Sequence, residues 1–158
     1  MEYCSKTTND GLLELNVPCS RDISEQKEFT FSATHDSKDP ELRNASVLVL
    51  FQFMPREVSE EEYLQISKQQ IESRYSDVKF KDVSSLNISG YHGRSIEVEY
   101  TDNGDRLYSL SAFALGGKAA LVFVGVAPVS KAKEMKPVFD KVLSTLTVDT
   151  SKKNVAEM

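Results

Sequence analysis

The sequence predicts an α+β protein, an α/β/α sandwich built on a mostly antiparallel sheet of about six or seven strands with helices on both faces. Three observations lead to this prediction. Residues 90–126 contain three extended segments separated by tight-turn signals. Two extended segments are apolar at both residue parities, which indicates strands that are covered on both faces. Two long segments with helical periodicity, one in mid-chain and one near the end, are available to provide that cover.

The N-terminal part of the chain is expected to hold two short strands. Residues 1–11 are mostly polar and predict a flexible arm. Apolar and polar residues alternate over 13–17, in a first strand that stops at Pro18 because proline has no N–H for a sheet ladder. After a polar turn over 21–26, the segment 28–33 alternates in the same way. We expect these two strands to pair with each other as a hairpin at the edge of the sheet.

The middle of the chain predicts a central strand followed by a helix. Ser46–Met54 is apolar on both faces and ends at Pro55. Ser59-Glu60-Glu61-Glu62 then matches a capping box, in which the serine oxygen and the last carboxylate bind free N–H groups at the start of a helix. The helix is expected over residues 59–74, with an apolar stripe broad enough to cover a sheet. The stripe consists of Leu64, Ile71 and Tyr75, widened by Tyr63 and Ile66.

A further strand is expected over residues 78–83, before the three extended segments begin. These segments are Tyr91–Tyr100, Arg106–Leu115 and Ala119–Val126. Asn103-Gly104 and Gly116-Gly117 stand between them and supply the positive-φ residues that tight hairpin turns require. Because these turns are too short for a crossover, we expect the three strands to be antiparallel neighbours.

The last element is expected to be a helix that covers the other face of the sheet. Ala132, Met135, Phe139, Val142 and Leu146 recur at helical spacing. Pro137 lies inside this pattern, so we expect either a kink or a short first turn followed by the main helix from about residue 136. The two-sided strands and the helical stripes together predict the core. Its expected members are Val49, Phe51, Ile71, Phe123, Val124, Phe139 and Val142.

Length and composition indicate one domain. A chain of 158 residues with 40% hydrophobic content is long enough for one well-buried hydrophobic core and too short for two domains of ordinary size. We place this domain at residues 12–148, between the arm at 1–11 and a flexible tail at 149–158. The net charge of -5 and a pI of ≈ 5.1 argue against a nucleic-acid or anionic-membrane surface, which would need clustered Lys and Arg.

The sequence predicts a soluble chain without a transmembrane segment. No apolar run approaches the roughly 20 residues that are needed to cross a bilayer. Met1 is followed at once by Glu2 and Tyr3, which does not match a signal peptide.

Cys4 and Cys19 are the two cysteines of the chain. One interpretation is a disulfide that ties the N-terminal arm to the first strand in an oxidising compartment, and the other is two unrelated thiols. The arm is long enough to fold back along the strand and bring the two residues together. Closing a loop of about 15 residues would stabilise the fold by roughly 3 kcal/mol. Both interpretations stay open.

No motif indicates an enzyme or a metal site. Two thiols and two distant histidines, His35 and His92, do not make a ligand cluster, and no nucleophile elbow, zinc-protease helix or phosphate-binding loop is present. The acidic residues within 57–62 suit the first turn of a helix because of its dipole. Glu97 and Glu99 lie about 7 Å apart on one strand, as in a glycosidase pair, but their alternation with apolar residues indicates a solvated face. We therefore expect no enzymatic activity, no catalytic, metal-binding or cofactor-binding residues, and no cofactor.

Several short segments occur in a recognisable order. They are Val17-Pro18, Ser59-Glu60-Glu61-Glu62-Tyr63, Asn87-Ile88-Ser89-Gly90-Tyr91-His92-Gly93, Gly116-Gly117-Lys118 and the closing run from Pro137 to Leu146. In this order and spacing the chain resembles the DcrB-like branch of the PsbP-like superfamily over residues 12–148. The tryptophan that is common after the first Val-Pro in that family is absent, and so is a lipobox before Cys4.

The resemblance implies a compact α/β/α sandwich that works by binding other proteins, without catalysis or a cofactor. Members of this superfamily include bacterial envelope lipoproteins, extrinsic subunits of a photosynthetic complex, a nuclear-transport protein that binds a small GTPase, and cytosolic chaperones. The resemblance favours the bacterial cell envelope over the cytoplasm as the location. In that case a signal sequence and a membrane tether would precede Glu2.

Two functions stay open at this point. The first is a non-catalytic protein-binding accessory domain of the DcrB-like type, associated with the envelope or acting as a cytosolic chaperone or adaptor, whose partner is another protein or peptide. The alternative is a small-molecule carrier or cryptic hydrolase that uses a pocket between sheet and helix. An apolar groove open to solvent would favour a peptide, whereas a closed pocket with convergent polar groups would favour a small ligand.

Overall fold

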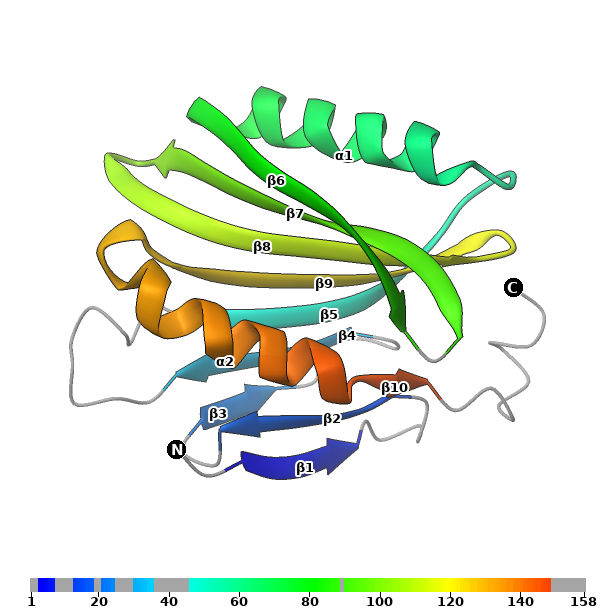
Figure 1. Ribbon diagram of the computed structural model, residues 1–158, viewed down its shortest axis with the longest axis horizontal. Helices are drawn as coiled ribbons and strands as arrows, with labels where there is room; N and C mark the ends of the chain where they lie inside the picture. The colour runs from blue at the N-terminus through cyan, green and yellow to red at the C-terminus, as the bar shows by residue number, and fades with distance from the viewer. Residues whose placement is uncertain are drawn as a thin grey trace.

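Ten strands and two α-helices make up the described part of the chain (Figure 1). The computed structural model describes residues 3–7, 13–18, 21–24, 30–35, 46–88 and 90–148, and for most of the first four strands and for 50–53 it describes the backbone alone. The elements are β1 (Tyr3–Thr7), β2 (Leu13–Pro18), β3 (Arg21–Ser24), β4 (Thr30–His35), β5 (Ser46–Phe53), α1 (Glu60–Arg74), β6 (Ser76–Ile88), β7 (Tyr91–Asp102), β8 (Asp105–Gly116), β9 (Ala119–Pro128), a 3-10 turn (Val129–Lys131), α2 (Ala132–Thr145) and β10 (Thr147–Val148).

The main sheet has seven strands in the order β3-β4-β5-β9-β8-β7-β6, and every neighbouring pair is antiparallel. The strands β7, β8 and β9 are consecutive neighbours, which confirms the predicted three-strand segment. Asn103 has φ 51, Gly104 has φ 85 and Gly117 has φ 63, so the two turns use the left-handed backbone that the sequence indicated. The two-sided strand β5 lies inside the sheet, between β4 and β9, as expected.

The two helices lie on opposite faces of this sheet (Figure 1). On one face, Phe139 and Val142 of α2 pack in one cluster with Phe123 of β9. On the other face, Tyr63 and Leu64 of α1 pack in a second cluster that includes residues from β7, β8 and β9. An α+β protein with an antiparallel sheet and two helices is therefore confirmed.

The N-terminal strands differ from the expectation. Tyr3–Thr7, within the predicted arm at 1–11, is strand β1 and pairs antiparallel with β2. The prediction that the first two expected strands, now β2 and β4, form an edge hairpin is wrong. β2 pairs with β1 and β10 in a separate three-stranded sheet, while β4 pairs with β3 and β5. The predicted turn at 21–26 contains β3. Ladder hydrogen bonds are made by the backbone, so polar sequences can form strands wherever the tertiary fold offers an edge. The predicted tail at 149–158 lies outside the described residues.

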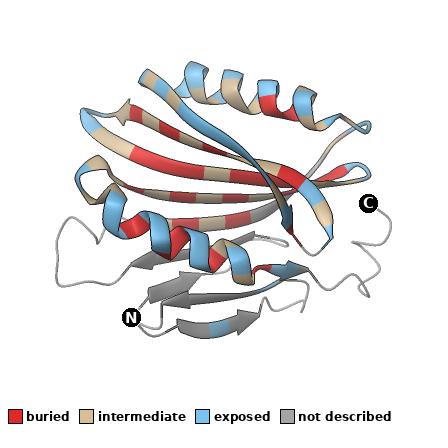
Figure 2. Cartoon of the chain, in the orientation of Figure 1, coloured by how far each residue is buried: buried red, intermediate tan, exposed pale blue. Residues whose placement is uncertain are grey.

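The first helix begins where the sequence predicted, but fewer of its residues are buried than the predicted apolar stripe implied. The Ser59 hydroxyl accepts a hydrogen bond from the Glu62 N–H at 3.1 Å, which is half of a capping box. The Glu62 carboxylate instead binds the guanidinium of Arg56, with Nη1 and Oε1 3.1 Å apart. Burial is confined to Tyr63 and Leu64, and most of the helix surface is exposed or half-buried (Figure 2).

The second helix runs without a break from Ala132 to Thr145 and contains Pro137. The expectation that the main helix starts at about residue 136 is therefore wrong. Pro137 is the sixth residue of α2, so the helix continues through it without the hydrogen bond that an N–H at this position would donate to the Lys133 carbonyl. The buried residues of α2 are Met135, Val138, Phe139 and Val142.

The predicted core is correct on the α2 side. Val49, Phe123, Phe139 and Val142 are all 0% exposed. Val124 and Ile71, which face the α1 side, are only half-buried. The side chain of Phe51 lies outside the described residues. The sheet is therefore covered well by α2 and incompletely by α1.

Candidate binding groove

A groove of about 580 Å³ lies between α1 and the main sheet. We call it the α1 groove. Side chains of α1 form one wall. The floor is the face of the sheet that α1 covers, with residues from β5, β7, β8 and β9. The apolar floor consists of Leu48, Ile96, Phe113, Val122, Val124 and Val126. The half-buried state of Val124 and Ile71 thus has a direct cause, because both side chains line this open space.

The groove exists because α1 is fastened to the sheet near its two ends. At the start of the helix, the Tyr63 ring packs on Phe113 with centroids 4.6 Å apart. At its end, the Tyr75 ring stacks on Tyr100 at 4.1 Å. Between these contacts, Ser67 faces the groove, and its side chain is too small to fill the space above the sheet.

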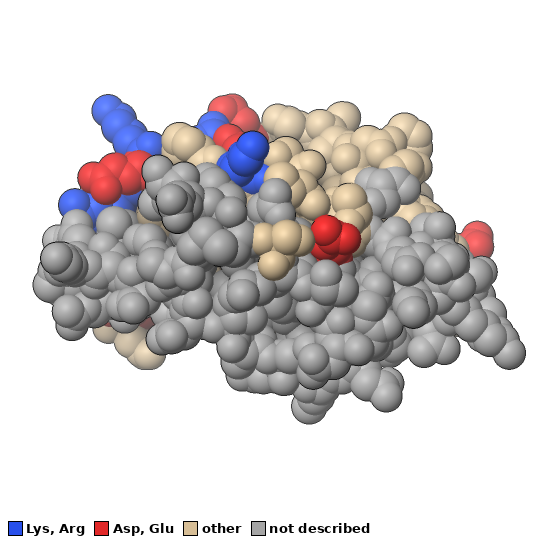
Figure 3. All heavy atoms as spheres, turned by 90° about the horizontal axis from the view of Figure 1, so that it is seen from below, with Lys and Arg blue, Asp and Glu red and all other residues tan. Residues whose placement is uncertain are grey.

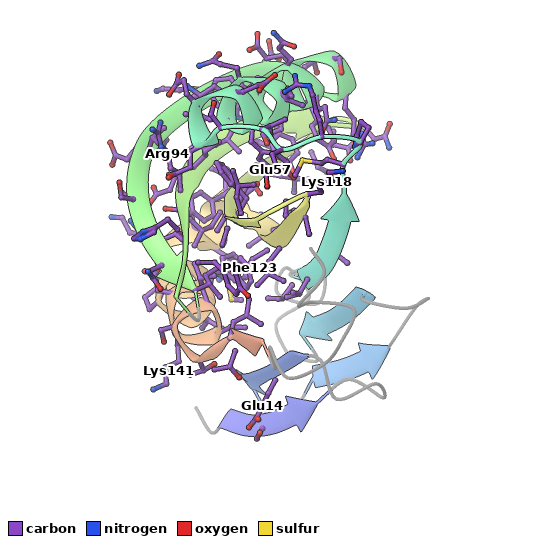
Figure 4. The ribbon with its side chains drawn as sticks, turned by 90° about the vertical axis from the view of Figure 1, so that its right-hand side faces the viewer. Glu14, Glu57, Arg94, Lys118, Phe123 and Lys141 are labelled. Atoms are coloured by element: carbon purple, nitrogen blue, oxygen red, sulfur yellow. The ribbon has the colours of Figure 1, made fainter. Side chains whose placement is uncertain are left out.

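Ion pairs add to the attachment at the start of α1. Arg94 of β7 reaches the first turn of the helix (Figure 4). Its Nη1 lies 2.8 Å from Oε2 of Glu61, and its Nε lies 3.5 Å from Oε1 of Glu60. Hydrogen bonds from Gln65 and Arg94 lower the pKa of the Glu61 carboxyl. The acidic first turn therefore holds the helix in place, beyond its favourable interaction with the helix dipole.

Polar groups also line the groove. Ser109 is 2% exposed, and its hydroxyl oxygen is 3.4 Å from that of Ser111. Burial raises the pKa of Tyr63 to about 12. Burial also raises the pKa of Tyr100 well above its usual value, helped by the nearby Tyr75 and Asp102. Both phenols therefore stay protonated at physiological pH.

The chemistry of the lining residues is that of binding. Arg74 is the one charged side chain among the described residues that line the groove. No His, Cys, Asp or Glu is among them, so Ser109 and Ser111 have no adjacent base that would activate a hydroxyl. In the described ranges, no group of three or more His, Cys, Asp or Glu is arranged to hold a metal ion.

Glu97 and Glu99 lie on the opposite face of the sheet, and the expectation of a solvated face is wrong for them. Their side chains are only 16% and 17% exposed. Glu97 pairs with Lys136 of α2, and the Glu99 Oε2 lies 2.5 Å from Nζ of Lys81. Arg106 also approaches Glu99, with Nη2 4.0 Å from Oε1. Lys136 of α2 covers Glu97, whereas Lys81 of β6 and Arg106 of β8 lie against Glu99. These cations compensate the charge of the two half-buried carboxylates.

The other residues singled out in the sequence are not brought together. His92 is exposed near the start of β7 and does not line the groove. The backbone of Cys4 lies in β1, opposite Val17 of β2. The side chains of His35 and Cys4 and all of Cys19 lie outside the described residues, so the question of a disulfide stays where the sequence left it.

The surface of the described residues is of mixed charge. In the view from below, Lys and Arg side chains lie next to Asp and Glu side chains, and the described part of that face shows no area of one sign (Figure 3). The described helices do not include one that is long and apolar enough to span a membrane.

The residues of the groove were not predicted from the sequence, although one signal for them is present. In β8, Ser109 and Ser111 alternate with Leu110 and Ala112, so small polar side chains occupy one face of a central strand. Such a face does not form a tightly packed core under a helix. The position of Arg74 at the groove mouth had no signal, because a basic residue in the last turn of a helix is common.

The fold and the groove define a class of protein: a small antiparallel α+β domain with a ligand-sized groove under one helix. No family model matches the chain, and no curated protein matches it. Solved structures with the same fold do. PA94 from Pseudomonas aeruginosa, a protein of unknown function, superposes on this chain with a TM-score of 0.70 and 14% sequence identity. The superposition covers 94% of this chain and 99% of PA94.

Two further structures place the fold. Cyanobacterial PsbP (CyanoP) from Synechocystis sp. PCC 6803 superposes with a TM-score of 0.66 and 10% identity, over 93% of this chain and 92% of that one. The Ran-binding protein Mog1p from Saccharomyces cerevisiae gives a TM-score of 0.69 and 12% identity, over 96% and 98%. The chain therefore has the fold shared by PsbP and Mog1p.

Proposed function

We propose that this chain is a non-catalytic binding protein of the DcrB-like type, and that the α1 groove is its binding site. The observation that carries the proposal is the groove itself. It measures about 580 Å³, and the aliphatic side chains that β5, β9 and α1 contribute to its lining are half-buried. Aliphatic surface that a protein leaves open in a concave site is available to bury against a partner.

The non-catalytic part of the proposal rests on the chemistry of the described lining residues. General acid–base or nucleophilic catalysis needs a base within hydrogen-bond reach of the reacting group. The groove instead offers neutral hydroxyls and a single guanidinium. These groups can position a ligand by hydrogen bonds and charge.

Binding a segment of another protein is the role that the sequence resemblance implies. Mog1p, which has this fold, is a Ran-binding protein. An accessory protein of the bacterial envelope, or a cytosolic chaperone or adaptor, would use the α1 groove to bury apolar side chains of its partner.

Carriage of a small molecule is a second candidate, and the size of the groove favours it. Sites for small ligands usually measure about 300–1,000 Å³ and are mostly apolar with a few polar groups. The α1 groove, at about 580 Å³ with Ser109, Ser111 and Tyr100 among its lining residues, meets both criteria.

Filling the groove tests the proposal. Val124 lies in the floor and is half-buried, so Val124→Trp would occupy the space while leaving the α2 side of the core unchanged. Val83, 40% exposed on β6 and outside the groove, is the matched control as Val83→Trp. The measurement is the fluorescence of anilinonaphthalene sulfonate, an apolar anionic dye, together with the melting temperature of each variant.

We expect the wild-type protein and the Val83→Trp variant to bind the dye, and the Val124→Trp variant to lose most of the binding while remaining folded. A photoreactive residue at position 124 should also cross-link a ligand or partner in cells, and one at position 83 should not. Equal dye binding by both tryptophan variants would contradict the assignment of the site.

A further inference from the structure

We propose that the ligand of the α1 groove is a long-chain monocarboxylate, whose acyl chain lies on the β5–β9 floor and whose carboxylate binds Arg74. This inference rests on the groove being the binding site. It names the ligand class from three features of the groove: its aliphatic floor, its lack of free backbone groups and its single cation.

The floor suits an unbranched apolar chain. Leu48 of β5 lies opposite Val124 of β9 in the sheet register, and Ser46 lies opposite Val126. Val122 continues the row, so aliphatic side chains follow one another along β9 for about 13 Å at the usual rise of a strand. All of them are half-buried rather than packed under α1. A single acyl chain along this row would cover them.

The floor does not suit an extended peptide. The backbone of β5 is already paired with β4 and β9, and that of β9 is paired with β5 and β8. A peptide that lies on this face would find no ladder partner, yet every residue would bring an N–H and a C=O that need hydrogen bonds. An acyl chain brings no such groups.

The charge at the mouth selects an anion. Arg74 stands in the last turn of α1, is exposed and lines the groove. Arg56, Arg94 and Arg106 each pair with a glutamate, but Arg74 has no carboxylate partner among the described residues. The planar guanidinium can bind both oxygens of a carboxylate at once. No described acidic residue lines the groove to repel such a ligand, although the protein carries a net charge of -5.

The experiment compares dodecanoate with dodecanol, which has the same chain and no charge. Both are titrated below their aggregation concentrations, against bound anilinonaphthalene sulfonate and by calorimetry. The variants are Arg74→Gln, which keeps the size and polarity, Val124→Trp, which fills the floor, and Arg56→Gln, a control arginine that is exposed and outside the groove. Val126→Phe, a smaller change in the same floor, serves if Val124→Trp does not fold.

We expect wild-type protein to bind dodecanoate about fivefold more tightly than dodecanol, the size of a favourable exposed ion pair of about 1 kcal/mol. Arg74→Gln should remove this difference and leave dodecanol binding unchanged. Arg56→Gln should change neither ligand, and the floor variant should weaken both.

Three outcomes would overturn the inference. Equal affinity for dodecanoate and dodecanol in the wild-type protein removes the carboxylate site and leaves the groove as an apolar site. Binding of an apolar nonapeptide in the groove, without binding of either lipid, overturns the ligand class and supports the proposed protein-binding function. If the floor variants bind every ligand as well as the wild type does, both the inference and the proposed function fail.

Discussion

The contact between Phe139 of α2 and Gly125 of β9 supports a prediction that can be worked out from the structure. Phe139 is 0% exposed, and its ring lies parallel to that of Tyr108, with centroids 6.5 Å apart. Phe139→Ala would leave a cavity between α2 and the sheet (Phe123, on the same face, is labelled in Figure 4). Loss of a buried phenylalanine side chain costs about 3–5 kcal/mol of unfolding free energy.

Gly125 makes the prediction more specific. A Cβ atom at this position would lie 2.6 Å from Cγ and 2.7 Å from Cδ1 of Phe139, well inside the contact distance of about 3.5–4.0 Å between carbon atoms. Gly125→Ala alone should therefore cost about 1–3 kcal/mol through overpacking. In the double variant the new methyl group enters the space that the ring has left. The double variant should then be more stable than the sum of the single changes predicts, by about 1–3 kcal/mol.

Equilibrium unfolding in urea, followed by circular dichroism, measures the four corners of this cycle. Since small domains are stable by about 5–15 kcal/mol, the single variants should remain measurable at reduced temperature. Val83→Ala, at an exposed position of β6, is the control and should change stability by less than about 0.5 kcal/mol. A Phe139→Ala cost below about 1 kcal/mol, or a cycle that is additive, would refute the packing of α2 on β9.

Three further predictions concern the start of α1 and the N-terminal strands. Ser59→Ala should cost about 1 kcal/mol in thermal or urea unfolding because a cap hydrogen bond is lost, whereas Ser59→Asp should be nearly neutral. The pKa of Tyr63 rises from 10.0 in the unfolded chain to about 12 on folding, so the unfolded state releases this proton first; stability should be intact below pH 10 and fall between pH 10 and 12. In the Tyr63→Phe variant the urea midpoint should decrease less steeply between pH 10 and 12 than in the wild type. An unchanged slope would contradict this assignment to Tyr63. A count of thiols in unfolded protein purified without reductant separates the two interpretations of Cys4 and Cys19: none if they are bridged, with a melting temperature that drops on reduction, and two if they are free.

Local patterns in the sequence were sufficient for the elements that depend on neighbouring residues. The turn at Asn103-Gly104 needs positive φ, and the helix at Ser59 needs a side-chain acceptor, so both can be read from a few residues. The three antiparallel neighbours β7, β8 and β9 follow from the short turns between them. The buried phenylalanines of β9 and α2 follow from apolar spacing, because that face is fully covered.

The partners of the N-terminal strands were not readable in the same way. The pairing of β2 with β1 and β10 joins segments at the two ends of the chain, and backbone hydrogen bonds carry no sequence code for such a choice. The burial of Glu97 and Glu99 was missed for a related reason. Alternation shows that a strand has two different faces, but the neighbouring elements, here α2 and β6, decide whether the polar face meets water or lysine side chains.

The sequence by itself determined the α+β class, the order of the central strands and the two helices that flank them, because periodicity and turn chemistry act over short distances. Only the tertiary structure decided that α1 contacts the sheet through Tyr63 and Tyr75 and leaves a gap above the sheet between these contacts. The α1 groove depends on this gap, and so does the place of Arg74 at its mouth. The apolar stripe of a helix indicates which of its residues prefer burial. The volume left between that helix and the sheet depends on how closely the two elements pack, which the stripe does not encode.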